Sequence, residues 1–173
     1  RPRTAAVEEK APRVPGLAYT PEFSPDSTEG VDGELARMLY RRLYGSDGLV
    51  RVHSLTETGE HRFSLRTDQV FADGTPITLE DVVYSLRRAG LDASADGRTL
   101  VVAGEEAEGI EKRLARVPIL KKNAGDAQFP MPSGAYLVQE DGLYDRDGVL
   151  CYALIRISTP EEALTAYQAG ELH

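Results

Sequence analysis

The clearest pattern along the chain is a four-residue spacing of apolar side chains that begins near residue 31. Val31, Leu35, Leu39 and Leu43 recur at this spacing, which places them on one face of an α-helix. Gly45 follows, and glycine readily adopts the left-handed conformation that ends many helices. We therefore predict a helix from residue 31 to about residue 45, with its apolar face against a core.

Alternating apolar and polar side chains predict short β-strands elsewhere. Phe63 and Leu65 alternate with polar residues, which is typical of a half-buried strand. Asp96 and Gly97 form a dipeptide that favours a hairpin turn. The predicted strands are residues 14–19, 49–55, 61–66, 91–95, 98–103, 135–140 and 149–157, with a turn-rich connection over residues 141–148.

Three further helices are predicted from their capping signals. Thr78 and Asp81 resemble a capping box, with Asp where Glu or Gln is usual. The first of these three helices follows this capping box. The second covers about residues 106–116, and the third begins at Thr159 and ends near Gly170. The sum is an α+β fold, a mixed sheet with about four helices. We expect residues 1–13 to be a flexible tail because they are charged and aperiodic, and residues 14–173 to form a single domain.

The composition fits an ordinary globular domain and narrows its partners. The chain has 173 residues, with 28 acidic and 20 basic side chains and a formal net charge of −8. This acidity argues against nucleic acid as a partner, because such binding needs a basic footprint. It argues equally against docking on an anionic membrane. No apolar run approaches the length of a membrane span.

The side chains that most often ligate metals or act as nucleophiles do not form a recognisable site. His53 and His61 lie eight residues apart across a predicted hairpin and could face each other, but no third ligand has a suitable spacing. We interpret them as surface histidines of strands. Cys151 is the single cysteine and lies on an apolar strand face, so we expect a small buried hydrophobe and not a nucleophile.

The known loop motifs also fail. Asp145–Gly148 resembles part of a calcium loop, but the full pattern would need acids where Leu143 and Leu154 stand. A turn between strands is the better interpretation. There is no glycine-rich phosphate loop and no nucleophile elbow. We therefore expect no catalytic residues, no metal and no cofactor, which leaves a binding or interaction role.

One stretch carries a specific resemblance. Residues 63–86, FSLRTDQVFADGTPITLEDVVYSL, are similar to the signature of family 5 extracellular solute-binding proteins, with Leu79 where the family has Ala. Further similar segments follow in the family's order, so that the resemblance extends over about residues 17–172. These segments are residues 29–48, 98–102, 117–122, 130–136 and 159–172.

The resemblance implies a fold and a role. Family members are the oligopeptide-, dipeptide- and nickel-binding components of ABC importers, with two lobes that close on the ligand. This chain corresponds to lobe I of a type II periplasmic-binding-protein-like fold, without the second lobe. It is then an isolated lobe of a longer protein, a minimal relative, or a lobe re-used as a sensory or protein-interaction module. The implied location is periplasmic or extracellular, with anchoring through a removed leader as one route to the membrane.

The same resemblance implies where a ligand would bind. In these proteins the extended segment before the first helix lines the cleft and pairs with peptide ligands. By position this segment is Ser27, Thr28, Glu29 and Gly30, where Glu29 could meet a peptide amine or be a solvated acid. Tyr19 and Tyr136 are candidate apolar walls. The expected partners are a small peptide or other solute, ABC permease subunits, and a second lobe or partner chain that completes the cleft.

Overall fold

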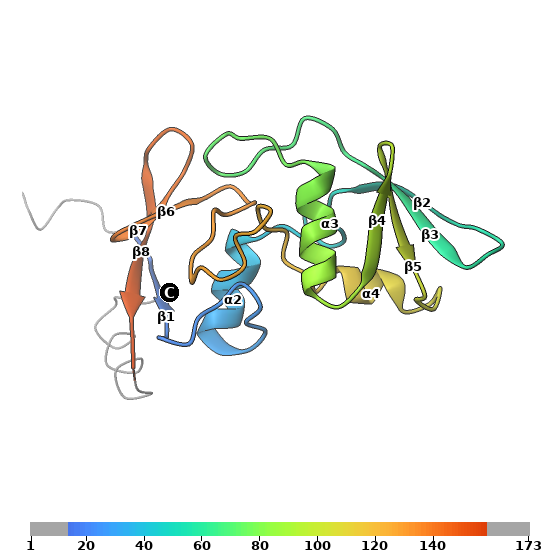
Figure 1. The fold of residues 1–173 in the computed structure, drawn as a ribbon. Helices are drawn as coiled ribbons and strands as arrows, with labels where there is room; N and C mark the ends of the chain where they lie inside the picture. The colour runs from blue at the N-terminus through green and yellow to red at the C-terminus, as the bar shows by residue number, and fades with distance from the viewer. Residues whose placement is uncertain (1–13, 159–173) are drawn as a thin grey trace, which may run out of the picture.

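The computed structural model describes residues 14–158, which contain three helices and eight strands in two four-stranded sheets (Figure 1). In chain order the elements are β1 (Gly16–Tyr19), α2 (Gly30–Leu39), β2 (Val50–Leu55), β3 (Glu60–Leu65), α3 (Leu79–Arg88), β4 (Asp92–Asp96), β5 (Thr99–Ala103), α4 (Ile110–Leu114), β6 (Leu137–Gln139), β7 (Gly142–Tyr144) and β8 (Leu150–Arg156). Within residues 14–158, none of the helices has the length and apolarity that a bilayer crossing needs.

The first sheet joins the two ends of the described chain. Its strand order is β1-β8-β7-β6, with β1 parallel to β8 and the other pairs antiparallel. Helix α2 packs beside this sheet (Figure 1). Their shared core, which we call the first cluster, is built around Phe23, Leu35, Leu39, Tyr40 and Leu143. These side chains are almost fully buried, so apolar burial holds α2 against the sheet.

The second sheet is wholly antiparallel, in the order β2-β3-β5-β4. Helices α3 and α4 both contribute to the core on one of its faces, which we call the second cluster. Phe63, Leu100 and Val102 supply the sheet side of this cluster, and Leu86 and Ile110 supply the helix side. The Asp96-Gly97 turn between β4 and β5 is found where it was predicted.

The predicted capping box of α3 is confirmed. The backbone N–H of Asp81 donates to Thr78 Oγ1 at 3.2 Å, and the N–H of Thr78 donates to Asp81 Oδ2 at 2.9 Å. Two of the otherwise unpaired N–H groups at the start of the helix are thereby satisfied. The helix ends before Gly90, which has a positive φ of 88° as expected for a helix terminator.

The prediction of a helix as far as residue 45 is wrong, because α2 ends at Leu39 and Tyr40 is already extended. The next residue, Arg41, pairs its backbone with other segments. Its N–H donates to Ser133 Oγ at 2.8 Å, and its carbonyl accepts from the N–H of Ile119 at 2.9 Å. The apolar spacing persists past the helix because Leu39 enters the first cluster and Leu43 the second.

The prediction of one mixed sheet with about four helices needs correction. There are two sheets, one mixed and one antiparallel, and residues 14–158 hold three helices. The fourth predicted helix, near residues 159–170, and the predicted tail, residues 1–13, lie outside the described residues. Helix α4 is shorter than predicted. Strand β7 lies inside the stretch predicted as a connection, because three residues are too few to show alternation.

Candidate functional site

The predicted ligand segment, residues 27–30, is a surface loop that leads into α2. Thr28, Glu29 and Gly30 are exposed, and Ser27 is half-buried. The loop is closed by hydrogen bonds between Ser24 and Ser27: the N–H of each donates to an oxygen of the other, both at 3.1 Å. Gly30 has a φ of 63°, a conformation that glycine adopts without strain. The loop therefore has a defined backbone.

Close packing on the first turn of α2 further fixes this loop. Gly33 is buried, and a Cβ added there would lie 2.4 Å from the carbonyl carbon of Thr28. The N–H of Gly33 also donates to the carbonyl of Glu29 at 3.0 Å. Only glycine lets the helix approach the loop backbone this closely.

Tyr19 lies near the same end of α2. The N–H of its neighbour Thr20 donates to Asp32 Oδ1 at 2.7 Å, which ties the end of β1 to the first turn of α2. The ring of Tyr19 packs edge-on against Phe129, with centroids 5.3 Å apart, and Phe129 stacks on Phe23 at 4.7 Å. Tyr19 is half-buried, so one part of it remains open to solvent.

Tyr136 lies beside a different strand of the first sheet. It precedes β6, whereas Tyr19 ends β1, and these strands form opposite edges of the sheet. Its ring packs edge-on against Tyr152 at 5.5 Å, and burial raises the pKa of the Tyr136 hydroxyl. The structure thus places Tyr19 near the segment of residues 27–30 and Tyr136 away from Tyr19.

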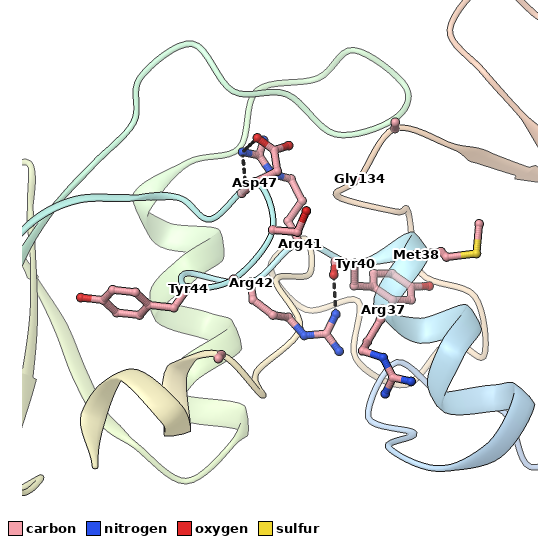
Figure 2. A pocket seen from close by; sticks show the side chains of 12 residues that line it. Arg37, Met38, Tyr40, Arg41, Arg42, Tyr44, Asp47 and Gly134 are labelled. Atoms are coloured by element: carbon pink, nitrogen blue, oxygen red, sulfur yellow. Dashed lines mark hydrogen bonds and ion pairs between the residues drawn. The ribbon is translucent and has the colours of Figure 1, made fainter. Parts of the chain in front are cut away.

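A cavity of about 320 Å³ lies at the other end of α2, where the chain leaves the helix (Figure 2). Arginine side chains and small residues line it, including Arg37, Arg41, Arg42, Gly134 and Ala135. The six residues predicted from the sequence do not line it. Arg37 connects the two places, because its Nη1 donates to the carbonyl of Thr28 at 3.3 Å.

Arg41 is committed to protein partners. Its side chain is buried, and its Nη1 donates to Gln69 Oε1 at 2.9 Å. Its Nη2 donates to the carbonyl of Asp47 at 3.0 Å and lies 3.4 Å from the Asp47 carboxylate. Burial lowers the pKa of Arg41, and the charge of Asp47 opposes this shift. Arg41 therefore fixes the 45–47 loop on the rim of the cavity.

Arg42 is held differently. Its Nη1 donates to the carbonyls of Ala36, at 3.3 Å, and Tyr40. Its Nε is buried and has no hydrogen-bond partner in the described part of the chain. Burial lowers the pKa of Arg42, the nearby charge of Arg37 lowers it further, and Asp26 opposes both. These arginines fall within the helix predicted to run to about residue 45, and the sequence analysis did not predict the cavity.

The prediction that His53 and His61 could face each other is confirmed, but their assignment to the surface is wrong for His61, which is fully buried. Their Nε2 and Nδ1 atoms lie 2.9 Å apart. His61 Nε2 lies 2.9 Å from the carbonyl of Glu105. A carbonyl only accepts, so His61 donates from Nε2, and in its neutral form it accepts at Nδ1 from His53.

Cys151 and residues 145–148, which the sequence analysis considered as a nucleophile and a calcium loop, have structural roles. Cys151 was predicted to be buried, but it is only half-buried. Its Sγ lies 3.4 Å from the carbonyl oxygen of Val149. The carbonyl of Asp145 accepts from the N–H of Gly148 at 3.1 Å, so this stretch is a turn between β7 and β8. Within residues 14–158, no three His, Cys, Asp or Glu side chains gather as a metal site would require.

Comparison with solved structures gives a consistent picture. The oligopeptide-binding protein AppA of Bacillus subtilis, in complex with a nonapeptide, matches 91% of this chain with a TM-score of 0.66 and 18% identity. NikZ of Campylobacter jejuni, in complex with Ni(L-His), matches 92% with a TM-score of 0.66 and 15% identity. OppA of Burkholderia pseudomallei matches 93% with a TM-score of 0.63 and 20% identity.

This chain covers 44%, 42% and 46% of those three chains, respectively. At these identities the likeness establishes the fold alone. The chain has the fold of one part of these peptide- and nickel-binding proteins, which is a type II periplasmic-binding-protein-like fold. The resemblance to family 5 solute-binding proteins is confirmed at this level.

Sequence comparisons add less. No family model matches the chain. A curated protein, the UDP-3-O-acyl-N-acetylglucosamine deacetylase of Oleidesulfovibrio alaskensis, is 30% identical over 122 residues. The match covers 67% of this chain but 40% of the deacetylase. The chain thus spans less than half of the length of AppA, NikZ, OppA and the deacetylase.

Proposed function

Because the chain has the fold of one part of the ABC-importer binding proteins, we propose that it is a ligand-capture lobe, with small peptides as the preferred solute. The observation that carries the proposal is the likeness to peptide-binding AppA over 91% of this chain. The signature in residues 63–86 supports the same assignment. We further propose that the lobe works outside the cytoplasmic membrane, delivers its solute to ABC permease subunits and catalyses no reaction.

The loop of residues 27–30 suits the recognition of an extended peptide. Glu29 is itself extended, with φ −123° and ψ 156°. Among the described residues, the N–H groups of Thr28 and Glu29 donate to no protein acceptor. A peptide can therefore pair with this backbone as an added strand. The exposed carboxylate of Glu29 would then attract the peptide amine, and Tyr19 would form a neighbouring apolar wall.

One wall is insufficient for tight binding. Pockets for small ligands usually enclose most of the ligand surface, and this chain covers 44% of AppA. We therefore propose that a second lobe, supplied by further sequence or by a partner chain, closes on the solute. The described lobe supplies the surface on which the peptide first docks.

NMR titration of the ¹⁵N-labelled 173-residue chain with a mixture of tripeptides to pentapeptides tests this function. We expect weak binding, with a Kd above about 1 μM because the site is half open, and shifted amide signals at residues 27–30. Glu29→Gln should weaken binding, whereas Glu34→Gln, an exposed acid on α2, should not. Submicromolar binding would contradict the half site, and unshifted signals at residues 27–30 would contradict the assigned segment.

A further inference from the structure

Apart from the solute-capture role, we propose that the cavity at the end of α2 is a binding site for a small oxyanion, a carboxylate or a phosphate, held between Arg37 and Arg42. The two side chains point to one side of the cavity, whereas Arg41 points the other way, toward Asp47 (Figure 2). This inference does not depend on the proposed function, because its residues differ from the predicted ligand segment.

The guanidinium group of Arg42 is prepositioned. Its Nη1 is anchored on the carbonyls of Ala36 and Tyr40 at the end of α2. This leaves the Nε and Nη2 groups without an acceptor in the part of the chain that the structure describes. Because Nε is buried, Nη2 is the group that we expect to donate a charge-assisted hydrogen bond to a carboxylate or phosphate oxygen in the cavity.

Arg37 provides the second charge. Its Nη1 donates to the carbonyl of Thr28 at 3.3 Å, so this side chain is also held by backbone and not by an acid. It is close enough to Arg42 for its charge to lower the pKa of that residue. Two like charges held together are unfavourable unless an anion lies between them.

The described part of the chain supplies no such anion. Neither Arg37 nor Arg42 forms an ion pair within residues 14–158. Asp26 is the acid whose charge acts on Arg42. Its carboxylate already pairs with Arg88, whose Nη1 and Nη2 donate to the two carboxylate oxygens at 2.8 and 2.6 Å. Asp47 pairs with Arg41 and Arg66. A bound oxyanion would complete the charge balance.

The cavity also has the size for such a ligand. Its volume of about 320 Å³ lies within the usual range for small-molecule pockets. Gly134 forms part of the lining and packs closely on the end of α2, since a Cβ there would lie 3.0 Å from the carbonyl oxygen of Met38. The chain as a whole carries a charge of −8, so two adjacent arginines that form no ion pair within residues 14–158 are a local departure from its acidic character.

Isothermal titration calorimetry of the 173-residue chain tests the site, with inorganic phosphate in one arm and succinate in the other, at ionic strength matched with chloride. We expect saturable binding that weakens about tenfold in Arg37→Ala and in Arg42→Ala, because each removes a charge-assisted hydrogen bond. Arg51→Ala is the matched control, since Arg51 is, like Arg37, an exposed arginine, and it lies on β2 and does not line the cavity. The affinity of the Arg51→Ala variant for phosphate or succinate should equal that of the unmodified chain.

Binding in only one arm identifies the ligand class and supports the site. The absence of saturable binding in both arms would overturn it, as would an affinity unchanged in Arg37→Ala. Arg42→Ala removes a contact that holds the end of α2, so circular dichroism should accompany it. Arg37 is exposed, and its variant decides the question if Arg42→Ala does not fold.

Discussion

The carboxylate of Asp81 accepts a hydrogen bond from the backbone N–H of Lys122, 41 residues away in the chain, at 2.8 Å. Its other oxygen, Oδ2, caps the first turn of α3 through the N–H of Thr78. One buried side chain therefore starts a helix and fixes a distant segment against it. This double role gives a structural reason for an acid at this position of the signature.

Removing Asp81 should therefore cost more than removing the cap alone. We expect Thr78→Ala to lower the free energy of unfolding by about 1 kcal/mol. Asp81→Ala should lower it by about 2–3 kcal/mol, because the N–H of Lys122 also loses its acceptor. Urea denaturation measures both, with the exposed neighbour Glu80→Ala as a control that changes it little. Equal losses at Thr78 and Asp81 would show that the Lys122 contact adds nothing.

Ser85 makes a second buried link between α3 and the same segment. Its Oγ accepts from the N–H of Leu120 at 2.8 Å and can donate to the carbonyl of Asp81, also at 2.8 Å. We expect Ser85→Ala to cost about 1–3 kcal/mol of stability, because the Leu120 N–H is left buried and unpaired. Thermal or urea unfolding measures this against Ser94→Ala, an exposed serine on β4. A loss at Ser85 no larger than that at Ser94 would refute the link.

Gly33 controls the loop that we assign to the ligand. A Cβ at this position collides with the backbone of Thr28, so Gly33→Ala should destabilise the fold by about 1–3 kcal/mol and shift the amide signals of residues 27–30. Gly109→Ala is the control, because a Cβ there meets no atom within 4 Å. If the two variants have the same stability and unchanged spectra, the packing of α2 on the loop is not required.

His53 makes stability depend on pH. Burial lowers the pKa of His53, the neighbouring His61 lowers it further, and Glu111 opposes them. The unfolded chain then binds more protons than the folded chain as the pH falls below the ordinary histidine pKa of about 6.5. Stability should therefore decrease from pH 7.5 towards about pH 5, within the range where carboxylates stay largely ionised.

His53→Gln should make this dependence weaker, since it removes the titrating group with the lowered pKa. Urea midpoints measured across the same pH range give the slope for each protein. A slope that is unchanged in His53→Gln would assign the pH dependence to other groups, and a protein that gains stability on acidification would contradict the sign.

The parts of the fold that local chemistry decides could be predicted from the sequence. The capping box at Thr78 and the turn at Asp96-Gly97 depend on neighbouring residues, and both are found. The end of α2 could not be predicted, because Arg41 leaves the helix to bond with Ser133 and Ile119. Such partners are distant in sequence and override the helical spacing.

The site shows the same division. His61 is buried, and the hydrogen-bond partner of its Nε2 is the carbonyl of Glu105, which follows β5 in the chain. No pattern near residue 61 signals this distant partner. The cavity lies where α2 ends before Arg41 and Arg42. The sequence analysis extended this helix to about residue 45 and therefore gave no reason to expect a cavity there. The assignment of residues 27–30, Tyr19 and Tyr136 to a ligand came from the family resemblance and stays a prediction.

The parallel pairing of Gly16 with Ala153 has a consequence for synthesis of the protein. The second sheet uses consecutive strands between residues 50 and 103, so a nascent chain can complete it early. The strand that contains Gly16 is synthesised well before β8 and has no partner on this edge until residues 150–156 have been made. During this interval its open backbone edge is available to chaperones or to other nascent chains.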